Sequence, residues 1–327
     1  MPCDQLTQSD RHTPPGRHVL LTGATGFIGS AVARALVGQL DIELSVLVRC
    51  PARIPRTRQL LGDLTQPDSL VGSCQGIDTL LHTASCVGTD LEQCTAVNDR
   101  GTTALLHEAT RSGVRRIIYI STAAVYGQGP HRNVEPEQLT PAPRSPASRS
   151  RLAAEETIRA AGGVVLRPHL IYGTGDRWFV PELIKLIKLL GDLPNADHVK
   201  VSTIAVDDLA RALTGLVTRS DALPPGTVLH ANHPAPTVLR TMIDTVTRNV
   251  GLYGINRCTS RRQANKQIRA NGNNEWHLVR ICTDHWYASQ RIWQLAGQDP
   301  GPGFAETFPR YAPWYRIQLS KHQQEPP

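Results

Sequence analysis

The sequence has little lysine, few aromatic residues and no long apolar run. Only five of its 35 basic residues are lysine, so a mechanism that requires lysine has few candidates. No segment approaches the roughly 20 consecutive apolar residues that a membrane-spanning helix needs. Residues 1–16 are polar, contain proline and lack the apolar core of a signal peptide. We therefore expect a cytoplasmic protein with no membrane partner and a disordered tail at residues 1–16.

The seven cysteines include no CxxC pair. An odd number without metal-ligand spacing indicates reduced thiols, so neither a disulfide framework nor a metal site is expected. The chain has a net charge of +7 and carries arginines at 257–269, with tryptophans after them. Because no zinc spacing or helix-turn-helix pattern accompanies these residues, we expect no nucleic-acid partner.

Short apolar runs alternate with segments of helical apolar spacing through the first half of the chain. Such alternation predicts an α/β fold with a doubly wound parallel (Rossmann) sheet, which we place at residues 17–176. The expected strands are 18–22, 43–48, 59–61, 78–82, 116–121 and 164–167, and the expected helices are 30–39, 102–112 and 151–161.

The pattern changes in residues 177–327, where we expect a smaller C-terminal α+β lobe that binds the substrate. Its expected helices are 179–190, 207–218 and 237–250, with short strands at 201–206 and 227–230. Between the two regions, residues 129–149 are rich in proline and arginine without periodicity. Long irregular segments often cover binding sites, so we predict a lid-like loop at 129–150.

Three glycines punctuate the turn between the first strand and the first helix. Gly23 permits a tight turn, Gly26 lets backbone amides approach a pyrophosphate, and Gly29 allows close packing of helix and strand. The second strand ends in Arg49, with Arg53 shortly after it, where an NAD site usually has an acidic residue. A guanidinium suits a 2′-phosphate, so we predict NADP(H) as the cofactor in preference to NAD(H).

Ordered motifs from His18 to Thr245 resemble those of extended short-chain dehydrogenase/reductases, the NAD-dependent epimerase/dehydratase family. These motifs are TGATGFIG at 22–29, GDL at 62–64, HTAS at 82–85, NDRGT at 98–102, STAAVYG at 121–127, RPHLIYG at 167–173 and TIAVDD at 203–208. In addition to the glycines and arginines above, the resemblance implies cofactor contacts at Thr25, Phe27, Ile28, Asp63, Leu64, Thr83, Ala84, Asn98, Arg151, Pro168, Leu170 and Ile171.

The family's catalytic set is a Ser or Thr, a Tyr and a Lys. Thr122 matches the hydroxyl residue, but the segment at 146–155 has Ala147 in place of the Tyr and Arg151 in place of the Lys. Tyr287 has an arginine four residues later, yet it lies in the distal lobe, and we expect no catalytic role for it. Alanine cannot donate a proton, and arginine stays protonated at neutral pH. The proton must then come from water, from a phenol of the substrate, or through a hydroxyl relay at Ser85, Ser121, Thr122 or Ser148.

The degenerate motif resembles atypical ketoreductases of antibiotic biosynthesis. This resemblance implies NAD(P)H-dependent reduction of a ketone on a bulky aromatic polyketide, such as an angucyclinone. The alternative is a catalytically dead protein that binds NADP as a sensor or binds a partner. An epimerase or dehydratase is disfavoured because these enzymes depend on the missing Tyr. The oligomeric state stays open.

Overall fold

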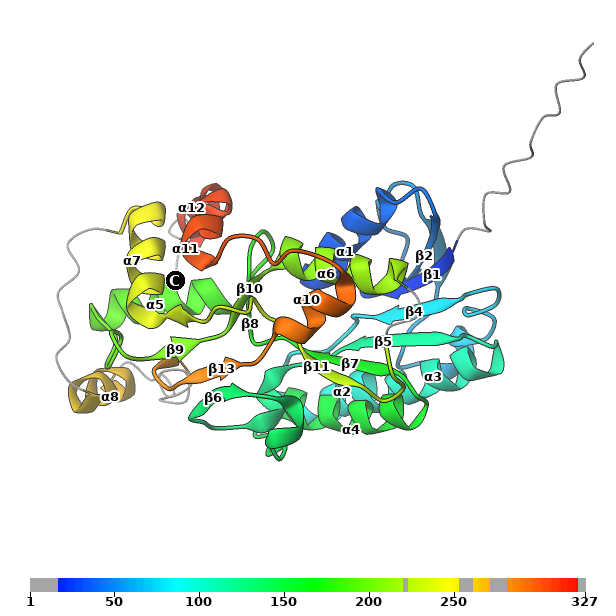
Figure 1. Ribbon diagram of the computed structural model, residues 1–327, viewed down its shortest axis with the longest axis horizontal. Helices are drawn as coiled ribbons and strands as arrows, with labels where there is room; N and C mark the ends of the chain where they lie inside the picture. The colour runs from blue at the N-terminus through cyan, green and yellow to red at the C-terminus, as the bar shows by residue number, and fades with distance from the viewer. Residues whose placement is uncertain (1–16, 220–222, 253–260, 271–280, 323–327) are drawn as a thin grey trace, which may run out of the picture.

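A sheet of parallel strands forms the centre of the molecule (Figure 1). The computed structural model describes residues 17–219, 223–252, 261–270 and 281–322, so the expected tail at 1–16 lies outside the described residues. All strand pairs of this sheet are parallel. The order across it is β11 (Val228–His230), β7 (Val164–Arg167), β5 (Arg116–Ile120), β4 (Thr79–His82), β1 (Arg17–Thr22), β2 (Ile42–Val48) and β3 (Arg58–Leu61).

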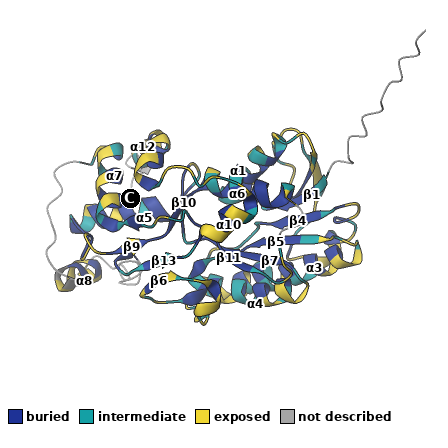
Figure 2. Cartoon of the chain, viewed as in Figure 1, coloured by how far each residue is buried: buried dark blue, intermediate teal, exposed yellow. Residues whose placement is uncertain are grey.

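Helices cover both faces of the sheet, which is why its central strands are continuous apolar runs. One face packs against α1 (Phe27–Val37), α6 (Val206–Thr218) and α10 (Gln290–Ala296). The other face packs against α3 (Gly101–Arg111) and α4 (Pro146–Ala160). Figure 2 shows the strands buried and the outer helix surfaces exposed. The predicted Rossmann-type α/β fold is confirmed.

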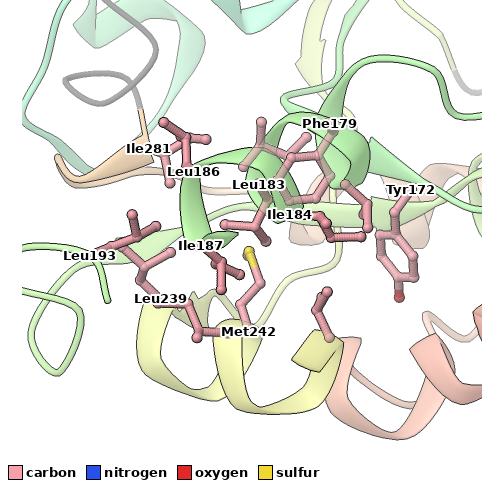
Figure 3. Close-up of a cluster of buried hydrophobic side chains, with 14 of the residues drawn as sticks. Tyr172, Phe179, Leu183, Ile184, Leu186, Ile187, Leu193, Leu239, Met242 and Ile281 are labelled. Carbon is pink, nitrogen blue, oxygen red and sulfur yellow. The ribbon is translucent and has the colours of Figure 1, made fainter. Parts of the chain in front are cut away.

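A second group of elements packs around a separate apolar core. Figure 3 shows this core, where Leu183 and Ile187 of α5 meet Leu239 and Met242 of α7. The helices of this region are α5 (Phe179–Leu190), α7 (Leu239–Val250), α8 (Arg261–Ala270), α11 (Phe304–Thr307) and α12 (Ala312–His322). Its strands are β8 (Leu170–Tyr172) paired with β10 (Thr203–Ala205), and a sheet in the order β12 (Thr237–Val238), β9 (Lys200–Val201), β13 (His285–Tyr287) and β6 (His131–Val134).

The segment predicted as an irregular loop at 129–150 contains regular structure. β6 pairs in parallel with β13, and the segment includes the first five residues of α4, which Ser145 caps. The strand escaped prediction because His131–Val134 has no apolar alternation and its partner strand is distant in sequence, with His131 paired to His285. The segment predicted as a lid-like loop at 129–150 therefore includes a strand and the start of a helix, and its role as a lid stays a prediction.

Two elements of the C-terminal half belong to the Rossmann region. β11 joins the edge of the main sheet beside β7, and α6 packs on α1, so both elements extend the Rossmann region instead of the smaller lobe. The short helix α2 (Leu91–Cys94) leads into a π-helical turn at Thr95–Arg100, which continues into α3. Within the described residues, no helix combines the length and apolar character needed to cross a membrane.

Candidate active site

The turn after β1 leads directly into the N-terminus of α1. Gly26 is the N-cap of this helix, which has neither a side-chain cap nor an acidic residue in its first turn. Gly23 has a φ of +72°, and a Cβ on Gly29 would lie 2.1 Å from the Gly23 carbonyl oxygen. The turn therefore accepts glycine alone at these positions, and the helix N-terminus is left available for an anion.

The end of β4 is fixed against this turn by hydrogen bonds. The Thr83 hydroxyl donates to the Thr22 carbonyl at 2.7 Å, and the Thr22 hydroxyl accepts from the amides of Thr83 and Ala84 at 3.2 Å. A Cβ on Gly23 would lie 2.6 Å from the Ala84 nitrogen. These contacts bring the predicted residues Thr83 and Ala84 directly beside the glycine turn.

The predicted adenosine end lies at the neighbouring strand ends. Arg49 and Arg53 are exposed after β2. The Asp63 carboxylate, after β3, accepts from the amide and hydroxyl of Thr65 at 2.8 Å. The Thr65 amide hydrogen bond holds the pKa of Asp63 below its usual value, and the charge of Arg49 contributes. Leu64 is buried beside it.

Arg151 reaches from α4 to the ends of β4 and β5. Its Nε donates to the Ser85 hydroxyl at 2.7 Å, and its Nη1 donates to the Ser121 carbonyl at 3.4 Å. Ser85 also bonds the Asn98 amide oxygen at 3.1 Å, and Asn98 donates to Ser150 on α4. Burial lowers the pKa of Arg151, but arginine begins so far above neutrality that it stays a cation.

A cavity of about 140 Å³ opens beside Thr122. Its walls include the start of the turn at 122–124 and Ser145 and Ser148 of the α4 N-terminus. Both serines lie within two residues of Ala147, the position that the motif match assigns to the family's Tyr. The remaining lining residues are Gly127, Gln128, Arg144, His169, Leu170, His285 and Tyr287.

The three hydroxyls singled out from the sequence occupy different environments. Thr122 lines the cavity, and its oxygen accepts from the Ala124 amide at 3.1 Å. The Ser121 hydroxyl is buried and has no hydrogen-bond partner within the described part of the chain. The Ser85 hydroxyl is bound to Arg151 and Asn98. Only Thr122 is thus placed both in the predicted motif and on this cavity.

Comparison with known proteins supports the dinucleotide interpretation of this geometry. The model of the NAD dependent epimerase/dehydratase family matches residues 19–231. The chain belongs to this family. It is 26% identical to a 2-alkyl-3-oxoalkanoate reductase of Stenotrophomonas maltophilia (strain K279a), over 83% of this chain and 91% of that protein. It is 28% identical to a 4-hydroxy-2-methyl-3-oxo-4-farnesyl-3,4-dihydroquinoline-1-oxide ketoreductase of Stigmatella aurantiaca, over 71% of this chain and 73% of that protein.

Solved structures of the epimerase/dehydratase type share the fold. An NAD-bound dTDP-glucose 4,6-dehydratase from Streptomyces venezuelae superposes with a TM-score of 0.70 at 21% identity, covering 93% of this chain and 98% of that one. An NAD-bound UDP-glucuronic acid 4-epimerase from Bacillus cereus gives 0.71 at 19% identity, covering 93% and 97%. Together with the reductase relatives, the family identifies the chain as an NAD(P)-dependent oxidoreductase.

Against this family background, the structure brings an aromatic cluster to the cavity that the sequence did not indicate. Tyr287 and Thr122 are far apart in the sequence. They line the same cavity because β13 pairs with β6. The Tyr287 ring contacts those of Tyr126, His230 and His169. Tyr287, which is distant from Thr122 in the sequence, is thus close to it in space. Tyr126 and His169 are the members of this cluster that lie inside the motifs quoted above.

The residues after β7 lie beside the turn at 122–124. The Ala123 amide donates to the Pro168 carbonyl at 2.8 Å, and Leu170 and Ile171 follow in β8. Behind them, the Arg167 guanidinium forms a buried ion pair with Glu155 of α4 and donates to the Tyr126 hydroxyl at 2.7 Å. This network ties α4, which carries Ala147 and Arg151, to the main sheet.

Proposed function

We propose that this oxidoreductase reduces a ketone to a secondary alcohol on a bulky aromatic polyketide, of the angucyclinone type found in antibiotic biosynthesis, with NADPH as reductant. The observation that carries the proposal is the cavity beside Thr122, whose wall includes Ser145 and Ser148 on either side of Ala147. We infer that the ring bearing the ketone enters this cavity. Two relatives named for ketone reduction support the same reaction type.

The chain's residues suit this reaction. When bound, the reduced nicotinamide supplies a hydride to the carbonyl carbon. In this proposal Arg151, which donates to Ser85 beside the strand ends, would hold the ribose and add positive charge near the developing oxyanion. The Thr122 hydroxyl, on the cavity wall, would donate a hydrogen bond to the carbonyl oxygen. The uncapped start of α1 would hold the pyrophosphate, and Arg49 and Arg53 would hold the 2′-phosphate.

The cavity is smaller than the roughly 300–1,000 Å³ typical of small-molecule sites. We infer that it takes only the ring that carries the ketone, with the rest of the substrate outside. Arg144 and Gln128 at its wall are then the residues that meet the substrate's oxygen substituents.

The test is oxidation of NADPH by purified protein in the presence of 1-tetralone, 8-hydroxy-1-tetralone and larger aromatic polyketide ketones. We expect alcohol formation, and a loss of about 10-fold or more in kcat/KM for Thr122→Val but not for Thr122→Ser, since serine retains the hydroxyl. Tight NADPH binding without reduction of any ketone would instead favour the sensor, and would overturn the proposal.

A further inference from the structure

Ketone reduction by this chain requires a proton donor that the sequence motif does not provide. Hydride addition to the carbonyl carbon moves the C=O π electrons onto oxygen, and that oxygen must take up one proton to become the alcohol. Ala147 carries no acidic group, and Arg151 retains its proton at neutral pH. Resting on the proposed function, we propose that His169 donates this proton to the carbonyl oxygen.

The backbone places His169 next to the catalytic hydroxyl. The hydrogen bond from the Ala123 amide to the Pro168 carbonyl joins the residue after Thr122 to the residue before His169. The His169 amide is held by the Asn232 side chain at 2.8 Å. Thr122 and His169 therefore lie on adjoining strand ends and line the same cavity. A carbonyl oxygen that accepts from Thr122 is within the space that His169 borders.

The two aromatic neighbours of His169 in the cavity wall are committed elsewhere. His285 Nε2 accepts from the Gly129 amide at 3.0 Å, and its Nδ1 lies 3.0 Å from the Thr283 carbonyl, an arrangement that fixes a neutral ring with both nitrogens occupied. The Tyr287 hydroxyl lies 3.1 Å from His131 Nδ1, and burial raises the pKa of Tyr287. Neither group is suited to release a proton into the cavity near neutral pH.

The α4 side of the cavity offers no better donor. The Ser145 and Ser148 hydroxyls bond each other at 2.9 Å and form the N-terminal cap of the helix. Arg144 is a cation that keeps its proton. An imidazole is the side chain whose unperturbed titration falls near neutrality, and His169 is the remaining imidazole in the described cavity wall.

The neighbouring rings also orient the donor. The His169 ring centroid lies 5.6 Å from that of His285 and 5.5 Å from that of Tyr287. In the reaction, the imidazolium N–H bond breaks as the O–H bond of the alcohol forms, and the neutral imidazole then regains a proton from water. The titratable and charged groups that share the described cavity with His169 are Arg144, His285 and Tyr287.

The test compares His169→Gln with His107→Gln, an exposed histidine on α3, using NADPH and the two tetralones. General acid catalysis contributes about 10²- to 10⁴-fold, so we expect kcat of His169→Gln to fall by that factor on both ketones, with KM for NADPH unchanged. The wild-type rate should fall as pH rises through the imidazole titration, and this limb should disappear in the variant. Added imidazole should restore part of the rate of His169→Gly.

Other outcomes distinguish failure of the proton-donor proposal from failure of the proposed function. If His169→Gln retains full rate on 8-hydroxy-1-tetralone and loses it only on 1-tetralone, the substrate's phenol is the donor and the proposal is overturned. If the folded wild-type protein reduces no ketone, the proposed function fails. The ¹⁵N NMR signal of the His169 imidazole can be assigned because it is absent from the spectrum of His169→Gln. This signal then tests separately whether His169 contacts the ketone. The signal should shift when 1-tetralone is added to the NADP⁺ complex, and an unmoved signal refutes the role of His169.

Discussion

The turn around Gly23 and Gly29 and the cavity beside Thr122 differ in how much change they tolerate. At the turn, an added Cβ would meet backbone atoms at 2.1–2.6 Å, so the family pattern is retained there in full. Beside Thr122, about 140 Å³ stands open between side chains of several elements. The glycine turn is thus constrained by backbone geometry, whereas the cavity is bounded largely by side chains that other residues can replace.

The largest expected effect lies behind the cavity. Glu155→Ala would leave the Arg167 charge buried without its partner, and breaking such a pair costs about 3–5 kcal/mol of unfolding free energy. Urea unfolding of the variant measures this loss, with Glu156→Ala, an exposed position on the same helix, as the control. Equal stability of the two variants would show that the cavity wall does not depend on the ion pair.

The next effect concerns the glycine turn. Gly29→Ala would force its Cβ onto the Gly23 carbonyl, and we expect cofactor binding to weaken by about 100-fold because the turn must open. Gly38→Ala is the matched control, since its Cβ would lie 3.5 Å from the nearest atom. Calorimetric titration with NADPH compares them. Unchanged affinity for Gly29→Ala would remove the contrast between rigid turn and permissive cavity.

A smaller expected effect concerns cofactor preference at the end of β2, near the glycine turn. Arg49→Asp would replace charge-assisted hydrogen bonds to a 2′-phosphate by repulsion, and such bonds contribute about 1.5–3 kcal/mol each. We expect the preference for NADPH over NADH to fall by about 10- to 100-fold in kcat/KM. Arg58 begins β3, whereas Arg49 lies beside the end of that strand. Arg58→Asp should therefore not alter the ratio. The same ratio in both variants would refute the assignment of Arg49.

The remaining effect is a pH dependence of stability that involves buried histidines in both regions. Burial lowers the pKa of His82 to about 4, and Arg151 contributes; burial also lowers the pKa of His230 to about 3. Between pH 6.5 and these values the unfolded chain binds more protons, so stability falls on acidification by about 1.4 kcal/mol per pH unit for each histidine. Urea titrations of His82→Gln should show a shallower slope from pH 6.5 to 4, whereas His107→Gln should match the wild type.

The sequence predicted the main sheet well because each of its strands is a local apolar run. Six expected strands correspond to β1–β5 and β7, and α1 begins at Phe27, earlier than the expected residue 30, since glycines hide the start of the helix. The roles assigned to Arg49, Asp63 and the other cofactor residues stay predictions. The cavity could not be predicted, because His169, Tyr287 and Ser148 meet there only through pairing of β6 with β13 and packing of α4.

The pairing of β6 with β13 also bears on the order in which the protein folds. His131 and Tyr287 are 156 residues apart, and closing a loop of that length is slow compared with forming the β1–α1–β2 contacts. During synthesis, the nucleotide-binding strands emerge and can assemble well before β13 leaves the ribosome. The order of synthesis therefore allows the glycine turn to form before the wall bearing Tyr287 is complete.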